Sequence, residues 1–315
     1  MIENFYKNKV VLVTGGAGFI GSHLCDMLSN LKTKKIIVVD NLFLGTEENL
    51  TNLPDIIFYK SDASQFQSLL NIILKEQPDI VFNLATKALM YSFEDPFDSC
   101  KVNVDIALNL SEILRKGLYK KLIHISTSEV YGSAKKLPMN EEHFLDPETT
   151  YASGKASADL LLKTYYNQYK LDIVIARPFN NYGPRQNNKK YAAVVPITIS
   201  KILNNQAPIV SGNGLQTRDF IYVKDTAKFL IELGKYGLKG EIYNLGSGKE
   251  QSILDLVKQI CKIINFSKKI KFVNPRTADV HKHCSSIKKI KKVLPNYKLT
   301  SLSSGLKETI EFYKT

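Results

Sequence analysis

The sequence contains no tryptophan, and cysteine is scarce, with Cys25, Cys100, Cys261 and Cys284 as the only copies among 315 residues. None of them forms a C-x-x-C pair, so their spacing indicates neither a disulfide framework nor a zinc site. No apolar run approaches the roughly 20 residues that span a membrane, and the first residues lack the apolar core of a signal peptide. We therefore expect a cytoplasmic protein without a metal centre.

Acidic residues are outnumbered, with 30 Asp and Glu against 43 Lys and Arg, and the net charge is +13. A basic chain invites comparison with nucleic-acid-binding proteins. The excess is almost entirely lysine, dispersed along the chain, which favours a solvated surface and no nucleic-acid partner. The five arginines are more informative, because a guanidinium group matches the geometry of phosphate and carboxylate groups. Four of the five follow residue 176.

A glycine-rich turn lies near the N-terminus. Residues 9–14 form a short β-branched run typical of a buried strand, and a helical pattern extends over 19–31. Strand, glycine turn and helix are the context of a dinucleotide-binding loop. In such a loop, glycines let the backbone approach a pyrophosphate, and the helix N-terminus supplies N–H donors. We expect cofactor contacts from Gly15, Gly18, Phe19, Ile20 and Gly21.

Asp40 ends the next predicted strand, 36–39, and follows Gly21 by 19 residues. A carboxylate at this spacing binds the ribose hydroxyls of the adenosine. Because it repels the 2′-phosphate of NADP, the sequence predicts NAD as the cofactor.

Strand-like and helix-like segments alternate through the first half of the chain. Beyond the first two strands they lie at 56–60, 65–76, 79–84, 96–116 and 121–126, followed by the helix that contains residue 151 and a strand at 171–176. This alternation predicts an α/β fold with a doubly wound parallel sheet of the Rossmann type. We expect an NAD-binding domain at 1–177 and a smaller substrate-binding lobe at 178–315, some of whose segments return to the first domain. The ligand cleft should lie at the carboxyl ends of the strands.

Tyr151 and Lys155 are one helical turn apart in Thr-Tyr-Ala-Ser-Gly-Lys-Ala. The ordinary pKa of a phenol is about 10, and an ammonium group one turn away favours the phenolate and lowers that pKa. Tyr151 would then accept a proton from a sugar or alcohol hydroxyl. Together with a dinucleotide loop, this pair indicates hydride transfer. His281 and His283, in contrast, are interpreted as part of a polar loop.

The chain resembles, nearly from end to end, the nucleotide-sugar epimerases and dehydratases of the extended short-chain dehydrogenase/reductase family. The resemblance rests on ordered motifs: Thr-Gly-Gly-Ala-Gly-Phe-Ile-Gly at 14–21, Asp40-Asn41, Asp62, Asn83-Leu84-Ala85, Ser-Thr-Ser-Glu-Val-Tyr-Gly at 126–132, Tyr151-x-x-x-Lys155, Arg-Pro-Phe-Asn-Asn-Tyr-Gly-Pro-Arg at 177–185, Thr-Arg-Asp-Phe at 217–220, and Arg276 near Asp279.

The resemblance implies which residues bind the two ligands. Asp62 would hold the adenine and Lys155 the nicotinamide ribose, and the remaining expected cofactor contacts are Asn41, Ala63, Leu84 and Ala85. The substrate would be a nucleoside-diphosphate sugar, with its diphosphate and nucleoside contacted by Asn180, Arg218 and Arg276. Further substrate contacts are expected from Lys87, Ser128 and Arg185. Lys87 and Met90 are larger than the residues usual in their loop and should lie near the sugar.

The implied reaction begins with oxidation at C4 of a hexose or heptose. Tyr151 removes the hydroxyl proton while hydride passes to NAD, and Thr127 shares the hydrogen bond. The resulting 4-keto group acidifies the C5 hydrogen. In 4,6-dehydratases, a glutamate at the position of Glu129 removes this hydrogen before water leaves from C6.

The sequence leaves the later steps open. Thr127-Ser128-Glu129 matches the GDP-mannose branch of the 4,6-dehydratases, but it lacks the Asp acid that the dTDP-glucose branch carries in place of Ser128. The same triplet occurs in UDP-glucuronate decarboxylases, whereas 4-epimerases usually carry small residues at its last two positions. We expect a 4,6-dehydratase or an epimerase. The alternatives are a 4-dehydrogenase that releases the 4-keto sugar, a UDP-glucuronate-type decarboxylase, and a non-catalytic dinucleotide-binding sensor.

The resemblance also implies a homodimer, paired through helices near 97–116 and 151–169. The nucleotide base is open, because the loop 186–193 matches no pattern of base specificity.

Overall fold

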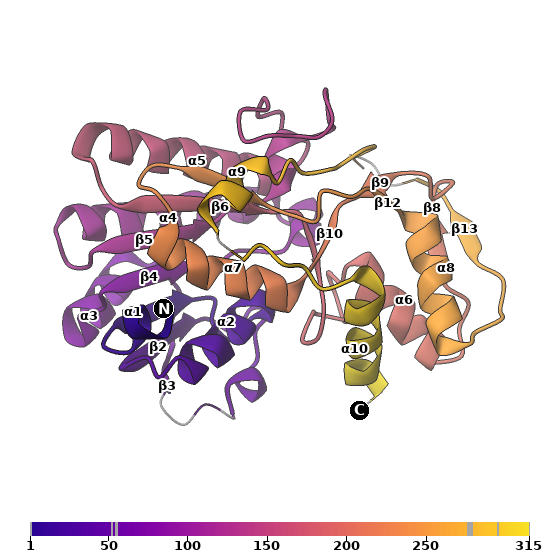
Figure 1. Cartoon of the computed structure of the whole chain (residues 1–315), viewed down its shortest axis with the longest axis horizontal. Helices are drawn as coiled ribbons and strands as arrows, with labels where there is room; N and C mark the ends of the chain where they lie inside the picture. The colour runs from indigo at the N-terminus through magenta and orange to yellow at the C-terminus, as the bar shows by residue number, and fades with distance from the viewer. Residues whose placement is uncertain (1, 52, 54–55, 276–279, 295, 315) are drawn as a thin grey trace.

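The computed structural model describes residues 2–51, 53, 56–275, 280–294 and 296–314. Its centre is a seven-stranded parallel sheet in the order β11-β6-β5-β4-β1-β2-β3 (Figure 1). The strands are β1 (Val10–Thr14), β2 (Lys35–Asp40), β3 (Ile56–Lys60), β4 (Ile80–Asn83), β5 (Lys121–Ile125), β6 (Ile173–Pro178) and β11 (Ile242–Leu245). This sheet confirms the predicted fold class, and the ends of the strands predicted in the first half differ from the observed ends by at most two residues.

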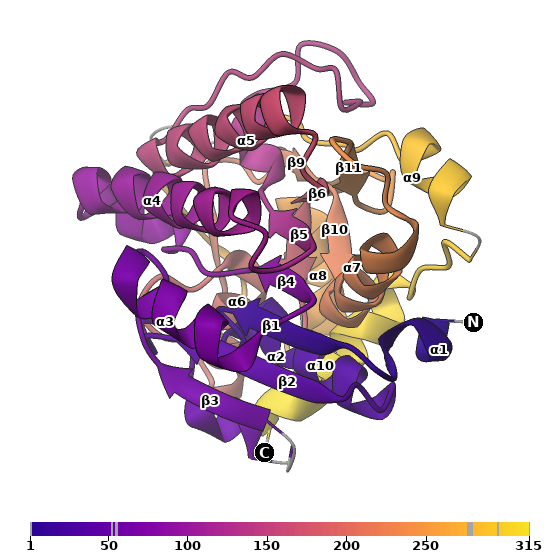
Figure 2. The same ribbon diagram turned by 90° about the vertical axis from the view of Figure 1, so that its left-hand side faces the viewer.

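Helices cover both faces of the sheet (Figure 2). One face packs against α2 (Phe19–Asn30) and α7 (Val223–Tyr236), and the other against α3 (Phe66–Glu76), α4 (Pro96–Arg115) and α5 (Thr150–Tyr169). Successive side chains of a strand point to opposite faces. Val11 and Val13 accordingly pack into the α2–α7 layer, and Leu12 packs into the α4–α5 layer. Because both faces are covered, the strands appear in the sequence as continuous apolar runs.

The chain beyond residue 178 adds β11 to the edge of this sheet and α7 to one of the layers that cover it. It also forms a second group of elements. In that group α6 (Val194–Leu203), α8 (Ile253–Ile264) and α10 (Leu302–Lys314) enclose their own apolar cluster, at the right of Figure 1. Three strand pairs accompany them: β7 (Asn180–Tyr182) with β10 (Phe220–Tyr222), β8 (Ile209–Ser211) with β13 (Lys271–Val273), and β9 (Thr217–Arg218) with β12 (Gln251–Ser252).

The remaining elements are short helices: α1 (Ile2–Tyr6), η1 (Glu47–Leu50), η2 (Leu89–Phe93), η3 (Ser128–Tyr131) and α9 (Lys288–Val293). In the part of the chain that the structure describes, no helix is both long and apolar enough to cross a membrane.

The strand order reverses between β1 and β4, so the chain leads from these strands to helices on opposite faces of the sheet, α2 and α4. Open α/β sheets bind ligands in the crevice formed at such a point. Gly15 follows β1 with a φ of +70°, and a Cβ atom there would lie 2.7 Å from the backbone nitrogen of Ala85, in the loop after β4. Glycine is therefore the residue that permits both this backbone conformation and the close approach of the two loops.

Candidate active site

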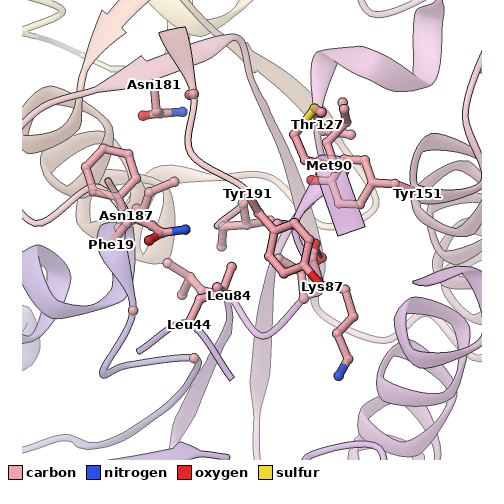
Figure 3. Close-up of a pocket in the computed structure, with 18 of the residues that line it drawn as sticks. Phe19, Leu44, Leu84, Lys87, Met90, Thr127, Tyr151, Asn181, Asn187 and Tyr191 are labelled. Carbon is pink, nitrogen blue, oxygen red and sulfur yellow. Dashed lines mark hydrogen bonds between the residues drawn. The ribbon is translucent and has the colours of Figure 1, made fainter. Parts of the chain in front are cut away.

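A cleft of about 520 Å³ opens at the carboxyl ends of the strands and is lined by both groups of elements. Every predicted site residue that the structure describes lines this cleft, and Arg276 lies outside the described residues. Figure 3 places Thr127, Tyr151 and Met90 together, apart from Phe19 and Leu44. The cleft thus has one part at the glycine turn and another at the end of β5 and the start of α5.

The glycine turn leads directly into the N-terminus of α2. The Gly15 nitrogen donates to the Val39 oxygen at 2.8 Å, which holds the turn against β2. A Cβ atom on Gly21 would lie 2.8 Å from the Gly16 Cα atom, so a larger residue would displace the turn. Gly18 is the N-cap of α2, and among the described residues no side chain caps this end. The first turn of α2 is therefore available to a pyrophosphate.

Asp40 ends β2 and is nearly buried. Its carboxylate accepts hydrogen bonds from the backbone nitrogens of Ala17, at 3.0 Å, and Leu42, at 2.8 Å. Burial raises the pKa of Asp40, and these two hydrogen bonds act in the opposite direction. The side chain is thus fixed between the glycine turn and the loop after β2, where an adenosine ribose would meet it.

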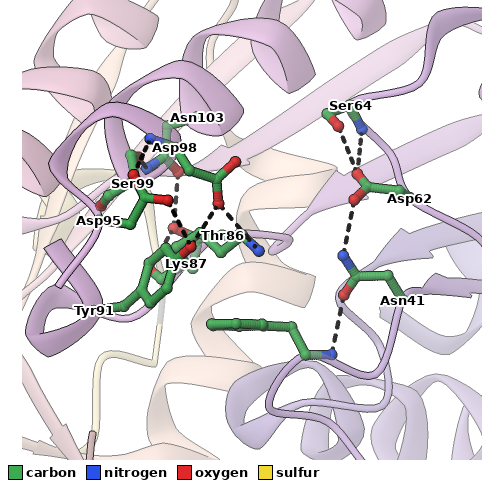
Figure 4. Close-up of polar contacts among 11 residues, drawn as sticks. Asn41, Asp62, Ser64, Thr86, Lys87, Tyr91, Asp95, Asp98, Ser99 and Asn103 are labelled. Atoms are coloured by element: carbon green, nitrogen blue, oxygen red, sulfur yellow. Dashed lines mark hydrogen bonds and ion pairs between the residues drawn. The ribbon is translucent and has the colours of Figure 1, made fainter.

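Asn41 and Asp62 form the neighbouring part of the wall (Figure 4). Asn41 Nδ2 donates to Asp62 Oδ2 at 2.9 Å, and Asp62 Oδ1 accepts from the nitrogen and hydroxyl of Ser64 at 2.8 and 2.7 Å. Burial alone would raise the pKa of Asp62, but the hydrogen bonds from Ser64 and Asn41 outweigh it and lower the pKa. Asp62 is therefore an ionised acceptor beside Ala63, which also lines the cleft.

Lys87 lines the cleft, and its ammonium has two close neighbours in the wall. Its ammonium lies 3.8 Å from the centre of the Phe43 ring and 3.3 Å from Asp98 Oδ2. Figures 3 and 4 show the side chain directed away from Thr127 and Tyr151, toward Asp98 and the side on which Asp62 lies. The nearby carboxylate and aromatic ring attract the ammonium. The expected contact of Lys87 with the sugar stays a prediction.

Tyr151 lies in the first turn of α5, opposite the end of β5. Its hydroxyl is hydrogen-bonded to the side chains of Thr127 and Thr86. Thr127 is the N-cap of η3 and also accepts from the Glu129 nitrogen at 3.2 Å. The start of η3, the first turn of α5 and the loop after β4 thus meet at the phenol.

The electrostatics at Tyr151 correct the expectation from sequence. Burial raises the pKa of Tyr151 to about 12, the nearby charge of Glu129 also raises it, and the hydrogen bonds from Thr127 and Thr86 only partly oppose this. The Lys155 ammonium donates to the backbone oxygen of Ile125 at 2.9 Å. The one-turn spacing is present, but it does not by itself produce a phenolate.

Lys155 is 2% exposed. Burial lowers its pKa to about 8, and the charge of Asp159, one turn further along α5, raises it. Most Lys155 side chains are therefore protonated at neutral pH. Bound NAD would bring its ribose hydroxyls and the positive charge of its oxidised nicotinamide to this end of the cleft. That added positive charge favours the Tyr151 phenolate.

The opposite wall carries the groups expected to bind the substrate. Asn180 Nδ2 is buried and has no hydrogen-bond partner among the described residues. Arg218 is nearly buried, and its Nη1 donates to the backbone oxygens of Thr217 and Val280. Arg185 lines the cleft, and its Nη1 donates to Asp26 Oδ2 of α2 at 2.7 Å.

Two side chains at the site were missed by the sequence reasoning. Thr86 contacts Tyr151, and its position directly after Asn83-Leu84-Ala85 was the available signal. His283 lies behind Ser128, with 3.5 Å between Nδ1 and the serine Oγ. No local pattern marks His283, because 155 residues separate the two positions.

A doubly wound sheet with a glycine turn at its switch point, and a Tyr-x-x-x-Lys pair facing the same cleft, define an NAD-dependent enzyme of the short-chain dehydrogenase/reductase class. Residues 11–246 match the NAD dependent epimerase/dehydratase family. The chain belongs to this family, as the resemblance implied, and it is an NAD-dependent nucleotide-sugar epimerase/dehydratase. NAD, the predicted cofactor, is confirmed.

Individual relatives include both kinds of enzyme. A putative UDP-glucose 4-epimerase of Methanocaldococcus jannaschii is 34% identical over 306 residues, which cover 97% of this chain and 98% of the relative. The structure of UDP-glucose 4-epimerase from Thermotoga maritima with UDP-glucose has a TM-score of 0.93 at 32% identity, covering 97% and 98% of the two chains. The structure of dTDP-glucose 4,6-dehydratase from Bacillus anthracis with NAD has a TM-score of 0.88 at 30% identity, covering 97% and 96%.

Proposed function

We propose that this protein is a 4,6-dehydratase, which oxidises C4 of a nucleoside-diphosphate hexose and then removes the C5 proton with Glu129. The position of Glu129 carries this proposal. It belongs to η3, directly after Thr127, it lines the cleft, and its charge raises the pKa of Tyr151. A carboxylate close enough to act on the phenol at C4 is placed to reach the adjacent carbon of the same sugar.

The first half-reaction uses the groups around Tyr151. NAD, when bound, accepts the hydride from C4. Tyr151 takes the C4 hydroxyl proton, and the hydrogen bond from Thr127 stabilises the phenolate that this step requires. Lys155 holds its positive charge at the same end of the cleft. Its pKa of about 8 keeps the ammonium protonated at neutral pH.

The second half-reaction begins when the 4-keto group acidifies the C5 hydrogen. Glu129 accepts this proton and passes it to the C6 oxygen, so that the C6–O bond breaks and water leaves. The hydride then returns to C6, and C5 regains one proton, which balances the proton that Tyr151 took from the C4 hydroxyl. We infer that Asn180 and Arg218 bind the diphosphate, because Asn180 Nδ2 is a buried donor without a described partner and Arg218 is a nearly buried cation in the same cleft.

Epimerisation at C4 is the second candidate. It needs the same oxidation, followed by return of the hydride to the opposite face of the 4-keto sugar. The similarity to the named UDP-glucose 4-epimerases favours it. The absence of an acid at position 128, where Ser128 stands, is also compatible with a reaction that loses no water.

We also propose that the protein works in the cytoplasm as a homodimer paired through α4 and α5. Phe97 and Leu108 on α4 and Leu160 on α5 are 75%, 40% and 60% exposed, which is unusual for large apolar side chains on packed helices. Light scattering tests this pairing, and Leu160→Glu should shift the protein toward monomer. A protein that is already monomeric before substitution would contradict the proposal.

Mass spectrometry of the products tests the reaction. The purified protein is incubated with NAD and the UDP, GDP and dTDP forms of the hexoses. Loss of water establishes the dehydratase, and unchanged mass with altered chromatography establishes the epimerase. Glu129→Gln should slow loss of water by about 10²- to 10⁴-fold while C4 oxidation, followed as bound NADH, continues. Unimpaired loss of water in this variant would remove Glu129 from the mechanism.

A further inference from the structure

A buried imidazole stands directly behind the serine of the Thr-Ser-Glu triplet. His283 is fully buried, and its Nδ1 lies 3.5 Å from Ser128 Oγ, at the outer limit of a hydrogen bond. Its other ring nitrogen, Nε2, lies 3.0 Å from the backbone oxygen of Gly132. The ring thus connects the first and last positions of the turn that carries Glu129.

The two contacts determine where the ring proton lies. A backbone oxygen only accepts hydrogen bonds, so Nε2 must carry the hydrogen in the contact with Gly132. Burial lowers the pKa of His283 to about 3, and the charge of Arg218 lowers it as well, so the imidazole is neutral at neutral pH. In this tautomer Nδ1 is an acceptor, and the Ser128 hydroxyl must donate to it.

The segment that carries His283 is held in place by hydrogen bonds of the two residues that follow it. Cys284 accepts from the Met139 nitrogen at 2.8 Å, and Ser285 donates its backbone N–H to Asp219 Oδ2 at 2.9 Å. The imidazole also packs on Phe179, with 5.5 Å between ring centres. The ring therefore has a fixed orientation, and it fixes the direction of the Ser128 hydroxyl hydrogen.

Ser128 consequently presents oxygen lone pairs to the cleft that it lines, between Thr127 and Glu129. A serine hydroxyl that could rotate freely would either donate or accept. Because its hydrogen is donated to His283, the Ser128 hydroxyl can accept a hydrogen bond from a ligand donor, but it repels a ligand acceptor. The carboxylate of Glu129 on the neighbouring residue adds a negative charge near the same position.

We propose that Ser128 and His283 form an acceptor site for the C6 hydroxyl of the sugar, and that this site selects hexoses over hexuronates. The inference rests on the proposed function, which places C4 at Tyr151 and C5 at Glu129. A C6 hydroxyl donates its hydrogen to Ser128. A C6 carboxylate has no hydrogen to donate at neutral pH, and it would meet the serine lone pairs and the charge of Glu129.

This site also distinguishes decarboxylation from dehydration and epimerisation, which the Thr-Ser-Glu triplet leaves open. Decarboxylation requires a C6 carboxylate, whereas dehydration and epimerisation of a hexose proceed with a C6 hydroxyl. The Ser128–His283 pair favours the latter substrates. His283 acts here as a positioning residue, because it contacts Ser128 and not the sugar.

A binding cycle tests the site without turnover. In the Tyr151→Phe background with NAD bound, calorimetry measures the Kd of the UDP and dTDP forms of glucose, 6-deoxyglucose and glucuronate. With Ser128 present, loss of the C6 hydroxyl should weaken binding about tenfold. With Ser128→Ala, the same loss should change Kd by less than about twofold. Glucuronate should bind at least about tenfold more weakly than glucose when Ser128 is present.

His283→Leu releases the Ser128 hydroxyl to donate, so the preference for glucose over glucuronate should fall about tenfold. His281→Leu, an exposed histidine on the same segment, is the matched control and should keep the preference. The inference is overturned if loss of the C6 hydroxyl changes Kd equally with and without Ser128, or if glucuronate binds as tightly as glucose. Dehydration of hexoses would still support the proposed function in either case. Absence of a 4-keto product from any hexose would overturn the proposed function, whatever the binding cycle gives.

Discussion

Asp159→Asn is expected to destabilise the protein by about 3–5 kcal/mol, because it leaves the Arg177 guanidinium buried without its counter-charge. Arg177 Nε lies 2.8 Å from Asp159 Oδ2, and the two side chains are 3% and 1% exposed. Ser126 Oγ donates to the same carboxylate oxygen at 2.9 Å, and Arg177 Nη1 donates to the Tyr131 hydroxyl at 2.9 Å. Removing the charge of Asp159 therefore disturbs a connected network one helical turn from Lys155.

The size of this effect can be measured by urea unfolding followed by circular dichroism, since the chain has no tryptophan to report by fluorescence. A loss of 3–5 kcal/mol corresponds to a fall in Tm of roughly 5–8 °C in a chain of 315 residues. Asp105→Asn is the matched control, because Asp105 pairs with Lys101 on the surface, where an ion pair contributes about 0–1 kcal/mol. The reasoning fails if Asp159→Asn is no more destabilising than Asp105→Asn.

A second variant separates the buried charge from simple loss of packing. Arg177→Met removes the cation, so adding it to Asp159→Asn removes the uncompensated charge. The double variant should be more stable than Asp159→Asn alone. If adding Arg177→Met destabilises the protein further, packing and not charge accounts for the effect.

The same substitution should change the pH dependence of the reaction. The charge of Asp159 raises the pKa of Lys155, which is about 8. Without it the pKa falls, and Lys155 loses its proton at a lower pH. The alkaline limb of the pH profile of C4 oxidation should therefore move to lower pH in Asp159→Asn. An unchanged limb would show that the titration of Lys155 does not control this step.

Tyr151→Phe should abolish turnover, measured as formation of bound NADH, while calorimetry should show that NAD still binds. An active variant would contradict the mechanism. Gly21→Ala should abolish NAD binding, because its Cβ atom would lie 2.8 Å from the Gly16 Cα atom in the glycine turn, and calorimetry measures the affinity. Burial lowers the pKa of His23 to about 4, so the free energy of unfolding falls as the pH drops from 6.5 toward 4, by about 1.4 kcal/mol per pH unit. His23→Gln should remove this part of the pH dependence. An equally steep urea-unfolding profile in the variant would contradict that assignment.

Local patterns made the sheet and the cofactor half of the cleft predictable. Apolar runs bounded by turns marked the parallel strands, because both faces of the sheet are covered. Gly15 and Asp40 could be assigned because each function depends on a fixed spacing along one strand-turn-helix unit. Such features are encoded within about 30 residues of chain, and the structure differs from the predictions only at the ends of elements.

Side-chain environments were less predictable, because they depend on residues far away in sequence. The neighbours of the Lys87 ammonium, Asp98 and Phe43, could not be predicted from the loop that carries it. Arg185 is paired with Asp26, 159 residues earlier. The pKa of Tyr151 is governed first by burial, and burial cannot be derived from the one-turn spacing to Lys155.

The triplet Thr127-Ser128-Glu129 shows why a motif can leave a reaction undecided. Its serine has no fixed chemical role, since a hydroxyl both donates and accepts. The neighbour that directs the hydroxyl is His283, which is brought to the triplet by contacts of its segment with Met139 and Asp219. A cationic side chain in place of His283 would attract a C6 carboxylate, whereas a neutral imidazole that accepts from Ser128 favours a C6 hydroxyl. The substrate preference of this site should therefore follow the residue at position 283 more closely than the triplet itself.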